Sequence, residues 1–205
     1  MGFLGTSKKY YWSAFAIEIG GEYVPGGWFK KEYIKYPYLH WEIFIDSHTG
    51  PDEVGETGTY TRFRAYISNP RNFSFRISRK KFDAGSEKFG DLYEIRVGDP
   101  DFDSRFVIKA NRTDQVLDLF ADQGLKDAIA LPRDLNLYIS DYRGQFRKKG
   151  IPYWVDTLMI RKRGDVYEKE DLRMYVEILT KTLYRLAEIG AIENEHPGVS
   201  IYAKR

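Results

Sequence analysis

The sequence predicts an α+β protein whose antiparallel sheet is packed by helices. Short segments rich in β-branched and aromatic residues recur through the first half of the chain, which is typical of strands. A second group of such segments follows residue 105, and apolar residues at helical spacing form one long stretch near the end. We expect a single domain over residues 1–205, and the alternative is a subdivision into residues 1–98 and 99–205.

The first half is predicted to contain one helix followed by five strands. The helix covers residues 9–19, and Gly20 and Gly21 end it. Strands are expected at 33–36, 39–45, 59–67, 73–78 and 93–97. Polar and apolar residues alternate along 59–67, which predicts a strand with one exposed face, and the Gly- and Pro-containing stretch 47–58 is predicted as a loop.

The second half is predicted to alternate strands and helices. The strands are 105–109, 135–140, 154–162 and 199–202, and 141–153 forms a long hairpin between the second and the third. Helical turns over 113–129 break near Gly124, and residues 168–189 form the most regular helix, with Gly190 as its cap. This order matches the split βαβ pattern, so residues 99–205 are expected to be ferredoxin-like. The predicted core residues are Trp12, Phe15, Phe63, Phe75, Phe106, Phe120, Leu179 and Leu183.

Composition describes a soluble chain and excludes several chemistries. The 205 residues are 42% hydrophobic and 30% charged, and 32 basic side chains against 30 acidic ones give a net charge of +2. This balance does not by itself indicate a nucleic-acid or membrane partner. Because there is no cysteine, disulfides, thiolate nucleophiles and Cys-ligated metals are excluded. With no membrane-spanning run and no secretory leader in the sequence, we expect a cytoplasmic location, with a peripheral membrane location as the alternative.

No catalytic, metal or cofactor site is predicted. The sequence contains no phosphate-binding loop or dinucleotide motif, and His40, His48 and His196 are unpaired in sequence. The run from Asp99 to Asp103 begins like a calcium loop, but its sixth and twelfth positions are not the required glycine and acidic residue. It is therefore predicted as a turn in which Asp103 bonds nearby amides.

The hairpin over residues 141–153 is the predicted partner-binding site. It is long, basic and aromatic, and long loops on rigid scaffolds often carry function. The candidate residues are Arg143, Phe146, Arg147, Lys148, Lys149, Tyr153 and Trp154. An acidic protein or a membrane surface is the first partner class, single-stranded nucleic acid is the second, and a homodimer contact is a third alternative.

The centre of the chain resembles a known family. Residues 98–109 read GDPDFDSRFVIK, which is similar to the "GDPxFxxxFxVK" strand–turn–strand signature of a bacterial family of domains of unknown function. The resemblance extends over residues 12–198, mainly through glycine and proline positions and aromatic residues. It implies a fold and transfers no catalytic residue. Relatives in that family often carry membrane-spanning helices ahead of such a domain.

These observations favour a non-enzymatic binding or scaffold module. A membrane-associated role is one form that this module could take. Whether the chain is an enzyme is left open, although the missing nucleophile, metal and phosphate motifs favour a binding role. Two alternatives stay open. One is a hydrolase or transferase with a dispersed site of Asp, Glu, His and Tyr residues, and the other is a protein that binds single-stranded nucleic acid.

Overall fold

The computed structural model describes residues 4–28, 31–51, 57–80, 92–140 and 150–202. In these residues nine strands form one sheet in the order β1-β2-β3-β4-β9-β8-β5-β7-β6. The ladders between them are antiparallel, which confirms the predicted α+β class. The strands are β1 Glu22–Val24, β2 Tyr33–Tyr38, β3 Trp41–Pro51, β4 Thr57–Ser68, β5 Phe75–Arg79, β6 Tyr93–Ile95, β7 Phe106–Ala110, β8 Asn136–Ser140 and β9 Val155–Arg163.

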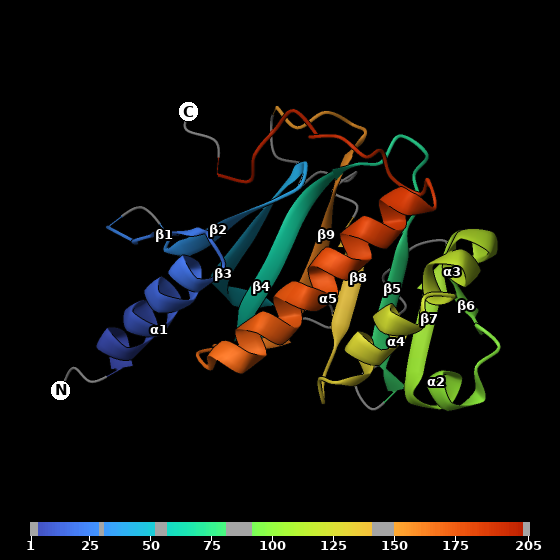
Figure 1. Cartoon of the computed structure of the whole chain (residues 1–205), viewed down its shortest axis with the longest axis horizontal. Helices are drawn as coiled ribbons and strands as arrows, with labels where there is room; N and C mark the ends of the chain where they lie inside the picture. The colour runs from blue at the N-terminus through green and yellow to red at the C-terminus, as the bar shows by residue number, and fades with distance from the viewer. Residues whose placement is uncertain (1–3, 29–30, 52–56, 81–91, 141–149, 203–205) are drawn as a thin grey trace.

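The helices cover one face of this sheet (Figure 1). They are α1 Leu4–Glu18, α2 Pro100–Arg105, α3 Thr113–Phe120, α4 Gln123–Ala130 and α5 Lys169–Glu188. Helix α5 crosses β4 and β9 at the centre of the sheet, and α1 lies over β1 and β2 at one end. The eight predicted core residues are all buried in this layer, so that part of the sequence prediction is confirmed.

The ferredoxin-like prediction for the second half is not confirmed. Strands β7 and β8 are both antiparallel to β5, so they run in the same direction, and α3 and α4 connect them. This is a split crossover, but the inserted strand β5 comes from the first half of the chain. The remaining second-half strand, β9, pairs on the other side of β8. The sheet therefore mixes strands of both halves.

Two first-half predictions are corrected in β3 and β4. Both strands extend into the predicted loop 47–58, because their ladder continues to the pair Pro51–Thr57. The polar face of β4 was expected to be exposed, yet Arg64 is only 5% exposed. Its guanidinium is instead paired with the buried carboxylate of Asp46 on β3, which makes burial of the charge tolerable.

Residues 100–105 form the helix α2 where a turn was predicted. Asp99 caps this helix by accepting a hydrogen bond from the Phe102 amide at 3.1 Å, and Pro100 occupies the first turn. The carboxylate of Asp103 accepts from the amides of Val97 and Gly98 at 3.0 and 3.1 Å, which confirms the predicted amide bonding.

The predicted strand 199–202 is also wrong. This segment ends in a turn and lies against the sheet face that the helices leave uncovered. Ile201 packs there with Phe44, Tyr66 and Val155 in a small second cluster. Its backbone makes no ladder with a named strand in the described part of the chain, so side-chain packing is what holds it in place.

Helix α5 provides the first testable prediction. Leu179 and Leu183 are both fully buried between α5 and the sheet, so Leu179→Ala and Leu183→Ala should each lower the free energy of unfolding by about 2–5 kcal/mol. Denaturant unfolding measures this change. Glu177→Ala, at an exposed position of the same helix, is the control and should change stability by about 0.5 kcal/mol or less. Leucine variants as stable as this control would contradict the packing.

Candidate functional site

The structure describes only one end of the predicted partner-binding hairpin. Tyr153 and Trp154 precede β9 with exposed fractions of 73% and 39%, and their rings meet edge to face with centroids 4.9 Å apart. The carbonyl of Trp154 accepts a hydrogen bond from the Asn69 amide at 2.7 Å, which ties this corner to the end of β4. The other candidates, Arg143, Phe146, Arg147, Lys148 and Lys149, lie outside the described residues.

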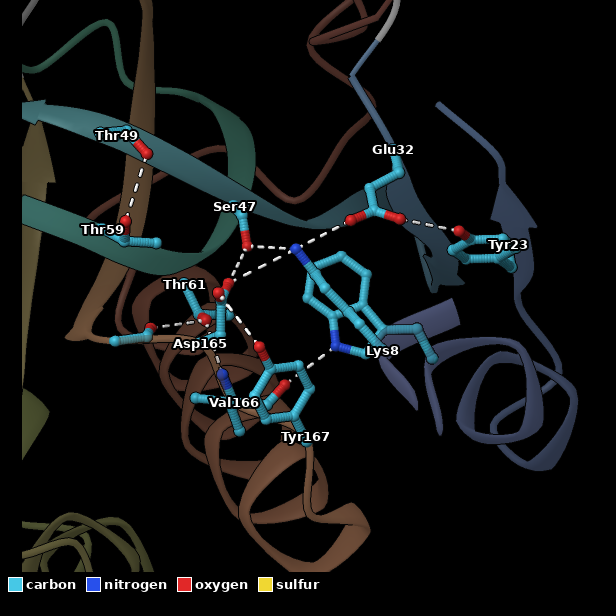
Figure 2. Close-up of polar contacts among 12 residues, drawn as sticks. Lys8, Tyr23, Glu32, Ser47, Thr49, Thr59, Thr61, Asp165, Val166 and Tyr167 are labelled. Atoms are coloured by element: carbon cyan, nitrogen blue, oxygen red, sulfur yellow. Dashed lines mark hydrogen bonds and ion pairs between the residues drawn. The ribbon is translucent and has the colours of Figure 1, made fainter. Parts of the chain in front are cut away.

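A polar cluster that the sequence analysis did not anticipate lies at the β1 end of the sheet (Figure 2). Lys8 of α1 donates a hydrogen bond to Ser47 of β3 at 2.6 Å and pairs with Glu32, which precedes β2, at 2.9 Å. Ser47 donates to the carboxylate of Asp165, which follows β9 and lies 3.4 Å from the Lys8 ammonium. We call these four residues the clamp.

Neighbouring contacts extend the clamp to the backbone before α5. The Trp12 indole donates to the carbonyl of Val166 at 2.9 Å, and the Val166 amide donates to the Thr61 hydroxyl at 2.9 Å. Tyr23 donates to Glu32 at 2.8 Å, and Tyr167 donates to Asp165 at 3.2 Å (Figure 2). Residues 164–167 are thereby fastened to both α1 and the sheet.

The contacts of the clamp shift the pKa of Asp165 and that of the neighbouring Tyr23. Burial by itself would raise the pKa of the Asp165 carboxyl, but the hydrogen bond from Ser47 and the charge of Lys8 outweigh it and hold that pKa below its usual value. Burial and the hydrogen bond to Glu32 raise the pKa of Tyr23 to about 12. The clamp is therefore a lysine between carboxylates, with neutral phenols around it.

Some nucleophilic active sites also place a serine beside a lysine, and the lysine there acts as the base that activates the serine. Lysine can take the serine proton only when its amine is neutral. Here the carboxylates of Glu32 and Asp165 lie 2.9 and 3.4 Å from the Lys8 nitrogen, so that nitrogen is engaged in two ion pairs. The Ser47 proton is already donated to Asp165, whose lowered pKa makes it a weak base near neutrality. The geometry favours a structural clamp over a catalytic dyad.

A second charged cluster lies on the sheet face opposite the helices. Asp46 is fully buried and accepts two hydrogen bonds from Arg62, at 2.8 and 2.7 Å, as well as one from Arg64. Burial would raise the pKa of Asp46, but the hydrogen bond from Arg62 and the two guanidinium charges bring it below its usual value. Tyr202 donates to the same carboxylate, and its ring stacks on Tyr33 with centroids 4.1 Å apart.

The three histidines are not gathered into a site. His40 is exposed in the turn between β2 and β3 and meets Trp41 edge to face. Burial, followed by the charges of Arg62 and Lys31, lowers the pKa of His48. His196 accepts a hydrogen bond from the Gly198 amide at 3.0 Å. Among the residues that the structure describes, no group of three or more His, Asp or Glu side chains is placed to hold a metal ion.

Comparison with known proteins identifies a similar fold and no family. No family model matches the chain, and no curated protein matches its sequence. The crystal structure of the mycobacterial trehalose monomycolate transport factor A, TtfA, superposes with a TM-score of 0.55 at 9% identity, covering 95% of this chain and 99% of that chain. At this identity the match establishes a shared fold. None of the described helices has the length and apolar character needed to cross a membrane.

The clamp gives a pH-dependent prediction. The folded-state pKa of Asp165 is depressed, so its contribution to stability is present above the unfolded-state pKa of about 3.9 and is lost as the pH falls through the folded-state value. Asp165→Asn should therefore lower the free energy of unfolding by about 1–3 kcal/mol near neutrality. Once the pH is below the folded-state pKa of Asp165, the parent and the variant should be equally stable.

Urea unfolding across a pH series measures both effects. Asp101→Asn is the matched control, because the Asp101 side chain is 78% exposed and its ion pair in the described part of the chain is with Arg105, one turn away. The control should follow the parent at every pH. An Asp165→Asn deficit that stays constant down to the lowest pH would show that the charge of Asp165 is not what stabilises the clamp.

Proposed function

We propose that this protein is a non-enzymatic binding or scaffold module of a transport system, working at a membrane surface. The observation that carries the proposal is the similarity to a transport factor over nearly the whole length of both chains. A likeness of this extent covers the complete fold and not one common motif. TtfA is a factor for the transport of trehalose monomycolate, and the proposal extends only the general role, transport, to this chain.

The chemistry of the clamp supports a role without catalysis. Within the described residues, the 2.6 Å contact between Ser47 and Lys8 is the observation that favours the hydrolase alternative. The contacts of both residues work against proton transfer between them, because the Lys8 nitrogen is engaged by two carboxylates and the Ser47 hydroxyl already donates to Asp165. Under the proposal, Ser47→Ala affects stability and leaves partner binding intact, whereas a hydrolase would lose turnover with this change.

The proposed partner site is the hairpin before β9. Its support in the structure is the exposed pair Tyr153 and Trp154, since aromatic side chains supply much of the binding energy at protein interfaces. The basic residues of the hairpin would add attraction to an acidic partner. The proposed site residues are Arg143, Phe146, Arg147, Lys148, Lys149, Tyr153 and Trp154. The proposed partner is an acidic surface of a membrane transport protein.

Site-specific photo-crosslinking in cells tests this proposal. A photoreactive phenylalanine at Tyr153 should form an adduct with a protein of the membrane fraction. The same probe at Tyr93, which is 51% exposed on the edge strand β6, is the control and should form none. In an Arg147→Glu, Lys148→Glu, Lys149→Glu background the Tyr153 adduct should fall about tenfold or more, because charge reversal repels an acidic partner.

Three other outcomes would contradict the proposal. Equal adducts at Tyr153 and Tyr93 would remove the hairpin as a specific site. An adduct consisting of two copies of this chain would make the hairpin a homodimer contact. An adduct with nucleic acid, together with binding that weakens steeply as salt is raised, would favour the nucleic-acid alternative.

A further inference from the structure

Helix α1 carries apolar residues on two opposite faces. Trp12, Phe15 and Ala16 point into the core and are at most 1% exposed. Tyr10 and Ile17, seven residues apart and so on one side of the helix, are 71% and 79% exposed. A helix that is apolar all round normally has both faces covered. In the described structure only the inner face of α1 is covered by the fold.

The loop between β1 and β2 places a tryptophan at the same end of the sheet. Trp28 follows the Pro25-Gly26-Gly27 turn and is 98% exposed. Helix α1 packs directly on β1 and β2, the two strands on either side of Trp28 in the sequence, and Figure 1 shows all three elements at the same end of the sheet. We call Tyr10, Ile17 and Trp28 the apolar edge.

Positive charge accompanies the apolar edge. Lys9 and Lys31 are both exposed, one in α1 and the other between Trp28 and β2, where its ammonium lies 3.3 Å from the Nδ1 of His48. The acidic residue of α1, Glu18, is already neutralised by ion pairs with Lys169 and Arg173. Aromatic residues with a polar tip and flanking lysines are the combination that settles at the boundary between lipid headgroups and acyl chains.

We infer that the apolar edge is a membrane-contact surface that inserts Trp28 and Tyr10 into the interface of an anionic bilayer. The inference deepens the proposed function by naming the surface that faces the membrane, and it rests on that proposal for its biological setting. The contact is peripheral, since it uses a loop tip and one helix face. Tyr153 directly precedes β9, in the middle of the strand order, whereas the apolar edge lies at the β1 end, so the two positions are separate.

Tryptophan fluorescence with lipid vesicles provides the direct test. Trp12 and Trp41 are buried, so in a Trp154→Phe background Trp28 is the exposed indole of the chain. Vesicles of phosphatidylcholine and phosphatidylglycerol should shift its emission to the blue, and lipids brominated on the acyl chain should quench it. Vesicles of phosphatidylcholine alone should give a weaker response, and added salt should reduce the anionic response.

Vesicle co-sedimentation then measures the energetic share of each residue. Trp28→Ala and Ile17→Ser should each weaken binding about tenfold or more, because each removes a large apolar side chain from the lipid contact. Leu131→Ser is the matched control: Leu131 is 65% exposed beyond α4 and should be replaceable without effect. Since Trp28 and Ile17 lie in solvent, these variants should melt like the parent.

Failure of the apolar edge as a membrane-contact surface can be told apart from failure of the proposed function. Vesicle binding without a blue shift or quenching of Trp28, or binding that Trp28→Ala leaves unchanged, overturns the apolar edge as the contact surface. So does the absence of any vesicle binding, or a dimer that Trp28→Ala dissociates in sedimentation velocity, which would assign the edge to a second copy. None of these results changes the crosslinking at Tyr153, which decides the proposed function independently.

Discussion

The ladder between β4 and β9 is the constraint on which the rest of the structure depends. It joins the two halves of the chain at the centre of the sheet, with Phe63 opposite Ile160 and Ala65 opposite Leu158. Gly164, just beyond the end of β9, continues this pairing with β4. Its amide donates to the Thr59 carbonyl at 2.8 Å, and its carbonyl accepts from the Thr61 amide at 3.0 Å. Because residues 164–167 are fixed in this way, Asp165 meets Lys8 and α5 begins over the sheet centre. A register slip by one residue would turn the Phe63 side of β4 away from the helices.

The sheet face that the described helices leave uncovered carries a buried charge cluster around Asp46 beside the small apolar cluster of Ile201. Asp46 is fully buried, which is tolerable only because Arg62 and Arg64 both bond it. The segment that ends at Tyr202 closes over this group, and burial next to Asp46 raises the pKa of Tyr202 to about 12. The phenol therefore stays a neutral donor at physiological pH. Losing one arginine would leave an incompletely compensated buried carboxylate, so both arginines of β4 are needed beside Asp46.

The sequence predicted features that depend on local pattern, and it missed those that depend on distant pairing. Helix α5 and buried residues such as Trp12 and Phe63 follow from periodicity and side-chain size. The burial of Arg64 could not be predicted, because its partner Asp46 is on another strand. In a strand with alternating polar and apolar residues, an arginine normally indicates the face exposed to solvent. Asp99 and Pro100 are typical of the start of a helix, as N-cap and first helical residue, so helix α2 could have been predicted from them. The sequence analysis interpreted them as a turn. The four residues of the clamp come from four separate segments of the chain. A pattern in one segment cannot predict that the four side chains meet.

The clamp also explains how an apolar helix at the edge of a sheet can present a defined surface. Hydrophobic burial by itself does not fix the rotation of α1, since its inner and outer faces are both apolar and either could pack against the core. Lys8 removes this ambiguity, because its pairing with Glu32 and Asp165 fixes the rotation of the helix and Trp12 secures the next turn through Val166. The outer face is then held at one orientation relative to the β1–β2 loop. A surface pre-organised in this way loses less conformational entropy when it binds, and this is the physical link between the polar clamp and the apolar edge beside it.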